Sequence, residues 1–166
     1  MGTAHPCKRP AGLLMKRRIL MLDPDTNQAK VARLEALHAQ YLAYVRLCVQ
    51  NMLDQRVFNL SKSDRQTFFP AATHLTSQIE KNARDHAIAI VSTWAKGVYA
   101  RKLKPTITNL WHEGLLTQDD AKALYIIGSK LLCEPWRFIT QEHLDAYHAL
   151  LDDTGGTHPQ CAIPSR

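Results

Sequence analysis

The sequence predicts a mainly α-helical chain, in which an antiparallel helical bundle follows one short β-strand. Two long segments repeat apolar side chains every three or four positions, the spacing of one helix face. Prolines at positions 24, 70 and 105 stand at the edges of these segments, and two shorter helical patterns follow them. A chain of 166 residues, 45% hydrophobic and 22% charged, has the size and composition of one globular domain.

The first expected element is a strand at residues 16–23, preceded by a flexible tail at 1–15. The basic residues Lys16, Arg17 and Arg18 run into the apolar segment Ile19 to Leu22, and Asp23-Pro24 ends the pattern. The backbone groups of this orphan strand need partners, and the sequence predicts no second strand beside it. Three outcomes stay open: no ordered partner, packing on the helices, or pairing with the CAIP stretch that begins at Cys161.

A helical domain is expected at residues 24–153. Its first long helix should occupy 25–56 with Asp25 or Thr26 as the cap, and its second should occupy 73–104 and end at Pro105. With a turn at 59–64 between them, we expect the two helices to pack antiparallel. Their buried centre should contain Leu34, Leu37, Tyr41, Ile79, Ala83, Ile90 and Trp94.

The remaining elements are shorter. A segment at 108–113 should end at Gly114, one helix should begin at Thr117, and a last helix should begin at Thr140 and stop before Gly155-Gly156. Threonine followed by acidic residues favours a helix start in both cases. Residues 154–166 are expected to form a loop or the start of a missing segment.

Charge is distributed unevenly along the chain, whose net charge is +6. Residues 1–104 hold 17 Lys and Arg against 7 Asp and Glu, whereas residues 105–166 hold 4 against 8. The polar face of the second long helix is mainly basic. Such a face suits the phosphate backbone of nucleic acid, and it is equally the pattern of a solvated helix surface.

Chemical motifs are absent from the sequence. There is no Walker loop, GxSxG or GxGxxG motif, and the spacing of His143 and His148 does not match a zinc-binding HExxH helix. The four cysteines form no CxxC pair and are expected to be free thiols. We therefore expect no catalytic residue, no metal site and no cofactor. Without a secretory signal or a membrane-spanning run, we expect a cytoplasmic protein with no membrane partner.

The order of features resembles the amino-terminal region of the TnpB (OrfB) transposon-associated RNA-guided nucleases and related type V CRISPR effectors. The resemblance rests on KRRILML, on DPDTNQAKVARLEAL, on the long helix with Tyr41, Tyr44 and Asn51, and on TFFPAATHLTSQIEKNARDHAIAIVSTWAKG. It covers residues 16–104 well and the remainder loosely. DPDTNQ departs from the Pro-Thr-x-Glu-Gln pattern commoner in the family, which leaves the register of the first helix open.

The resemblance implies that the strand belongs to an incomplete β-barrel and that the helices form a recognition lobe. The implied partners are a guide RNA, a target DNA and a separate or downstream nuclease domain, whose catalytic carboxylates do not occur in this chain. The resemblance implies that Gln78, Lys81, Asn82 and Arg84 meet phosphates or sugars, by shape and backbone. The basic residues that complete the expected nucleic-acid-binding set are Lys16, Arg17, Arg18, Lys96, Arg101, Lys102 and Lys104. The alternative is a helical protein-protein interaction or regulatory domain with a solvated basic surface.

Overall fold

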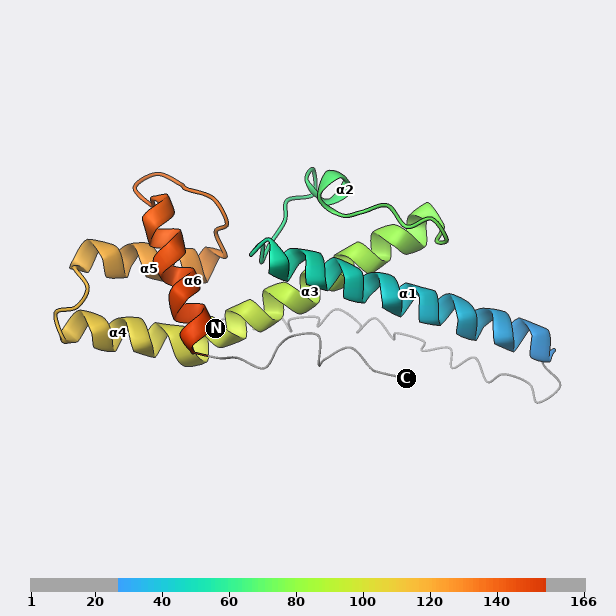
Figure 1. Ribbon diagram of the computed structural model, residues 1–166, viewed down its shortest axis with the longest axis horizontal. Coiled ribbons are helices and arrows are strands. Elements are labelled where there is room, and N and C mark those ends of the chain that lie inside the picture. Colours follow the sequence, from blue (N-terminus) through green and yellow to red (C-terminus); the bar gives the residue numbers. More distant parts are fainter. Residues whose placement is uncertain (1–26, 155–166) are drawn as a thin grey trace, which may run out of the picture.

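The computed structural model describes residues 27–154, and these are mainly helical (Figure 1). The helices are α1 (Gln28–Asp54), α2 (Arg65–Phe68), α3 (Ser77–Val98), the π-helix η1 (Tyr99–Leu103), α4 (Lys104–His112), α5 (Gln118–Lys130) and α6 (Gln141–Asp153). The prediction of a mainly α fold is confirmed. Within the described range no strand forms, and the predicted strand at 16–23 lies outside that range. No helix in the described range is long and apolar enough to cross a membrane.

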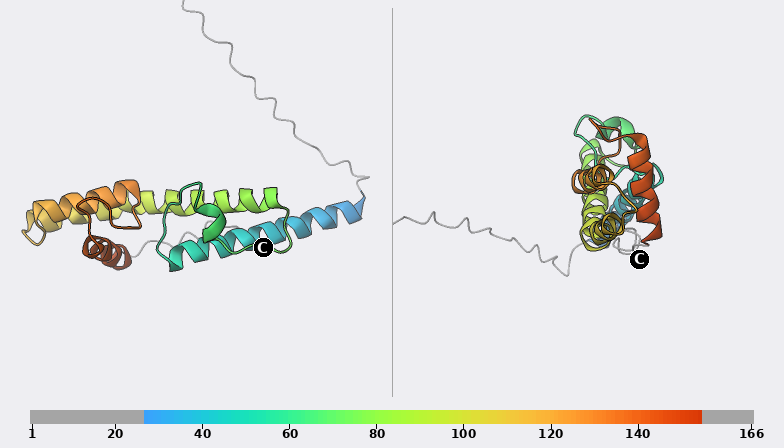
Figure 2. Two further views of the ribbon diagram at one scale, coloured as in Figure 1. Left: turned by 90° about the horizontal axis from the view of Figure 1, so that it is seen from above. Right: turned by 90° about the vertical axis from the view of Figure 1, so that its left-hand side faces the viewer.

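The two long helices run in the same direction, so the predicted antiparallel pairing is wrong (Figures 1 and 2). The hydroxyl of Tyr44 on α1 meets Arg84 near the start of α3, at 2.9 Å. Phe58, just past the end of α1, meets Trp94 near the end of α3, with ring centroids 6.2 Å apart. The reason is the connection at residues 55–76, which includes α2. It runs back along α1, where Asn51 donates a hydrogen bond to the Phe68 carbonyl at 3.1 Å and Tyr44 to that of Pro70 at 2.6 Å.

The buried centre differs from the predicted one. Of the seven residues expected inside, only Ala83 is fully buried; Leu37, Tyr41, Ile79, Ile90 and Trp94 are half-buried, and Leu34 is 57% exposed. Ile88, whose spacing from Lys81 and Arg84 would place it on the basic side of this helix, is buried. The physical reason is that α3 packs on both α1 and α5, so it buries a wider arc than one stripe. The small side chains of Ala83, Ala87 and Ala95 form much of that arc.

Pro105 does not end the second long helix, contrary to the prediction. The chain passes from α3 through η1 into α4, and Pro105 lies in the first turn of α4. Proline is tolerated there because the first turn does not need its missing N–H. The wider turn of η1 bonds the Lys104 N–H to the Tyr99 carbonyl, five residues back. Gly114 ends this element with φ +75°, close to the predicted end.

The starts of α5 and α6 are confirmed, and the two helix ends are bonded to each other. The Thr117 hydroxyl accepts a hydrogen bond from the Asp120 N–H at 3.1 Å, which caps α5. The His143 Nδ1 accepts from the Thr140 N–H at 3.1 Å, so its Nε2 donates to the Asp120 carboxylate, also at 3.1 Å. Hydrogen bonds from Thr117 and then His143 lower the pKa of Asp120. At the start of α1, the described cap is Asn27, which accepts from the Ala29 N–H at 2.9 Å; the expected caps Asp25 and Thr26 lie outside the described residues.

The loop after α1 contacts α6 through Phe58 and His148. Their rings are 5.9 Å apart and edge-on, and Arg56 binds Asp152 nearby at 2.8 Å. Burial lowers the pKa of His148, and the positive charge of Arg56 lowers it further. The Nε2 of His148 is buried without a hydrogen-bond partner among the described residues. Neutral imidazole is therefore the form that this contact favours.

This contact predicts loss of stability in mild acid. Below about pH 6.5 the unfolded chain protonates its histidine, whereas the folded chain resists protonation until a lower pH. The free energy of unfolding should therefore fall as pH drops through that window. In His148→Leu this part of the pH dependence should disappear. Urea unfolding of both proteins from pH 8 to pH 5 measures the difference, and a stability gap that does not vary with pH would contradict the assignment.

Candidate nucleic-acid interface

A groove of about 810 Å³ lies between α2 and the first turns of α3. The segment leading into α2 provides Lys62, and α2 itself provides Arg65 and Gln66. The α3 side provides Ser77, Gln78 and Lys81, followed by the two ion-paired residues Arg84 and Asp85. Figure 1 shows α2 lying beside the N-terminal half of α3. Polar side chains from distant parts of the sequence thus face one space.

The α2 side of the groove is held in place by its own polar contacts. The Ser61 hydroxyl bonds to the Asp64 carboxylate, and the Thr67 hydroxyl donates to the Asp64 carbonyl at 3.1 Å, which fixes the turn before α2. Phe69, which follows α2 directly, is buried, and its ring is edge-on to that of Phe68 with centroids 5.0 Å apart. Burial of Phe69 and the hydrogen bonds to Asp64 therefore hold α2 in place as one wall of the groove.

Arg84 has its partners inside the protein. Its guanidinium binds Glu80 one turn earlier and donates from Nε to the Tyr44 hydroxyl at 2.9 Å. The two charged side chains are only 13% and 16% exposed, so Arg84 joins α3 to α1 at the floor of the groove. Glu80 also accepts from the Ala72 N–H at 3.0 Å. Burial raises the pKa of Tyr44 to about 12, and its hydroxyl donates to the Pro70 carbonyl.

Lys62 and Lys81 are the two cations of the groove without a partner in the described part of the chain. Both are exposed, and neither forms a hydrogen bond or salt bridge there. Arg65 binds Asp85 at 2.6 Å through Nη1, while its buried Nε has no partner among the described residues. The two carboxylates that line the groove, Glu80 and Asp85, are each paired with an arginine. The net charge of the groove is therefore positive, because the two lysines remain.

The other predicted residues divide into two groups. Gln78 and Asn82 are exposed near the groove and bond to each other at 3.0 Å. The remaining four basic residues follow the rod formed by α3, η1 and α4 and do not line the groove: they are Lys96, Arg101, Lys102 and Lys104. Arg101 donates to the Gly97 carbonyl at 3.2 Å and Lys102 to that of Thr154 at 3.1 Å. Lys16, Arg17 and Arg18 lie outside the described residues.

Sequence reasoning missed Lys62 and Arg65. Both lie in SKSDRQ, which reads only as a turn between two helices. Their role follows from the return path of residues 55–76, which places the turn against α3. The signal in the sequence was a pair of cations close together in a polar turn. The predicted antiparallel arrangement gave no reason to expect this turn to lie against α3.

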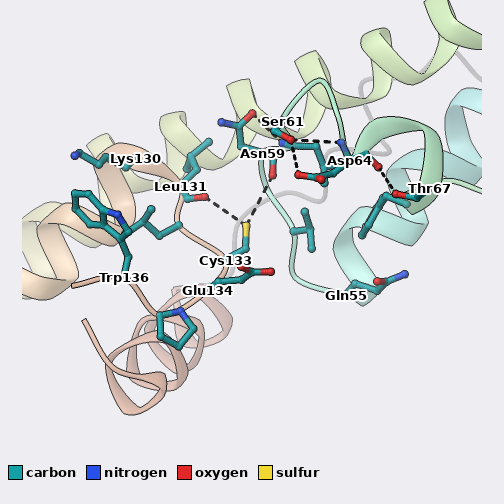
Figure 3. Close-up of a pocket in the computed structure, with 15 residues that line it drawn as sticks. Gln55, Asn59, Ser61, Asp64, Thr67, Lys130, Leu131, Cys133, Glu134 and Trp136 are labelled. Atoms are coloured by element: carbon teal, nitrogen blue, oxygen red, sulfur yellow. Dashed lines mark hydrogen bonds between the residues drawn. The ribbon is translucent and has the colours of Figure 1, made fainter. Parts of the chain in front are cut away.

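A second hollow, of about 590 Å³, lies between residues 55–68 and the loop after α5 (Figure 3). The Cys133 thiol donates weakly to the carbonyls of Leu131 at 3.4 Å and Asn59 at 3.9 Å. None of the described residues that line this hollow is a histidine able to act as its base. Lys130 at the rim lies 4.3 Å from the ring centroid of Trp136.

Neither a metal site nor a base-stacking tryptophan adds a second candidate site within the described residues. Within residues 27–154, no group of three His, Cys, Asp or Glu side chains is arranged to hold a metal ion. Trp94 is half-buried against Phe58, and Trp136 is covered by Lys130 and Arg137, whereas Trp111 is exposed. Comparisons of the chain with protein-family models, with curated proteins and with solved structures found no match.

Proposed function

We propose that this chain binds nucleic acid through phosphate contacts in the groove between α2 and α3. The observation that supports this most directly is the pair Lys62 and Lys81, two cations that line one groove with no internal partner in the described range. Lysine ammonium groups positioned in this way bind phosphate as point charges. Neutralising phosphates releases counterions from nucleic acid, and this release favours binding.

The polar lining of the groove supports phosphate contacts over an apolar ligand. Gln66, Ser77 and Gln78 line the same groove and add hydrogen-bond donors to it. Side chains of this kind bind phosphate and sugar oxygens and contribute little base specificity. A duplex recognised by its shape and backbone is therefore the ligand that fits these residues best.

At a finer level, we propose that the chain is a recognition module that binds a guide RNA and its target DNA, without nuclease activity of its own. The order of sequence features shared with the TnpB family supports this reading, and so does the basic groove. In this account a separate or downstream nuclease domain is the protein partner. The groove supplies backbone contacts, while sequence is read by base pairing between guide and target.

A paired set of variants tests the proposal. Lys62→Ala/Lys81→Ala removes the two unpaired cations of the groove, and Lys30→Ala/Arg33→Ala removes two exposed cations on α1. Fluorescence anisotropy with an RNA–DNA duplex, over a series of salt concentrations, measures affinity and its salt slope. The groove variant should bind more weakly to unrelated sequences and lose a slope of about 1 for each lysine. Equal effects in both variants would assign binding to net charge alone and overturn the proposal.

The alternative, a protein-protein interaction domain, is favoured by a different observation. Trp111, Leu115 and Phe138 are exposed near the α4–α5 end of the molecule. Exposed aromatic side chains are common in protein interfaces. A partner bound there would stay bound at high salt, whereas nucleic acid in the basic groove would dissociate.

A further inference from the structure

The first turns of α1 present an apolar stripe that no described helix covers. The stripe consists of Val31, Leu34 and Leu37, none of which packs against the hydrophobic core. Leu34 is 57% exposed. Figures 1 and 2 show this end of α1 projecting past the start of α3. Val31 and Leu37 are half-buried, so nearly two turns of one helix leave part of their apolar surface in water.

The stripe continues the face that α3 covers farther along. Met52 follows Leu34 by 18 residues, which is five turns of 3.6, so both side chains leave α1 in the same direction. Met52 is fully buried. Tyr41, two turns after Leu34, stacks on His86 of α3 with ring centroids 6.1 Å apart. Leu47 is also exposed, but it points away from this face and stands alone, which is ordinary for a surface leucine.

We propose that residues Ile19 to Leu22 of this same chain occupy the stripe. These four apolar residues precede α1 directly, and DPDTN between them and α1 has the composition of a chain reversal. The five residues from Asp23 to Asn27 span up to about 17 Å. Val31 to Leu37 lie about 5 to 14 Å along the axis from the start of α1, because each residue rises about 1.5 Å. The segment therefore reaches the whole stripe.

Other occupants fit less well. A stable dimer interface buries about 1,200 Å² or more, and three side chains within two helical turns provide much less. The end of α6, where the described chain stops, lies far from the start of α1 (Figure 1). An attached segment also docks at a high effective concentration, so a small contact area suffices. Docking on the stripe corresponds to packing on the helices, one of the three outcomes that the sequence leaves open for residues 19–22.

Hydrogen exchange of the full chain tests this docking. Ile19→Gln/Leu20→Gln/Leu22→Gln removes the apolar side chains of the segment, and Leu13→Gln/Leu14→Gln is the matched control outside it. In the segment variant, amides at residues 31–37 should exchange about tenfold faster or more, while those at the centre of α3 keep their rates. Leu34→Gln should produce the same change, and Leu47→Gln should not.

Several outcomes would overturn the proposal. One is an unchanged exchange rate at residues 31–37 in the segment variant. Another is an equal change in the Leu13→Gln/Leu14→Gln control. Protection that rises with protein concentration, together with a dimer in sedimentation that Leu34→Gln dissociates, would assign the stripe to a second copy of the chain.

Discussion

Replacing Gly128 with alanine should lower the free energy of unfolding by about 2 kcal/mol, the cost of overpacking a tight contact. A Cβ at this position would lie 2.1 Å from Cδ2 and 2.3 Å from Cε2 of the Tyr99 ring. The ring has little freedom to move, since Tyr99 lies in η1 and its hydroxyl donates to the Tyr125 carbonyl at 3.2 Å. The absence of a side chain at Gly128 therefore allows η1 to approach α5.

Gly97→Ala is the matched control, because Gly97 is also a glycine inside a helix. Its Cβ would meet only the end of the Arg101 side chain, at 3.1 Å from Nη2, which can move aside. Alanine should stabilise this position by about 0.5 to 1 kcal/mol, since it has the higher helix propensity. Denaturant unfolding measures both variants. A lower free energy of unfolding for Gly128→Ala, together with a higher one for Gly97→Ala, would support the close approach of η1 and α5. A Gly128→Ala protein as stable as the parent would refute it.

Arg84→Met should destabilise the fold by about 3 kcal/mol, because it leaves Glu80 charged and mostly buried without its partner. The Nε bond to the Tyr44 hydroxyl is lost as well. Lys81→Met, three residues earlier on the exposed side of α3, should change stability by less than about 0.5 kcal/mol.

The double variant Arg84→Met/Glu80→Met separates charge burial from packing. Removing both charges should recover much of the loss, since an apolar pair of similar size needs no charge partner. A single Arg84 variant as stable as Lys81→Met would show that the pair is only a surface contact. If Arg84 variants unfold, they lose affinity for nucleic acid whether or not Arg84 contacts it. The binding test therefore uses Lys62 and Lys81 instead.

Local patterns predicted the helices well, because their causes lie within a few residues. Thr117 and Thr140 start helices through contacts three residues away, and apolar spacing located the bodies of α1 and α3. Pro105 shows the limit of a local rule. The rule that proline ends a helix holds for a continuing α-helix, and the wider turn of η1 let a new helix begin there instead.

The relation between elements was not predictable from the same patterns. The direction of α3 relative to α1 depends on the return path of residues 55–76. Hydrogen bonds from Asn51 and Tyr44 to the carbonyls of Phe68 and Pro70 hold this path along α1. The same path places Lys62 opposite Lys81, and no spacing in the sequence indicates that pairing. Arg84 has the appearance of a surface cation in the sequence, and only the packing of α3 on α1 turns it inward.

Lysine footprinting tests the central claim, that nucleic acid binds in the groove between α2 and α3, most directly. The reactivity of each lysine amine towards an acylating reagent is measured by mass spectrometry, with and without an RNA–DNA duplex at low salt. Binding in the groove predicts that Lys62 and Lys81 lose reactivity, whereas Lys30 and Lys122 keep theirs. Unchanged reactivity of Lys62 and Lys81, with protection at Lys96 and Lys104 or at no lysine, would contradict the claim.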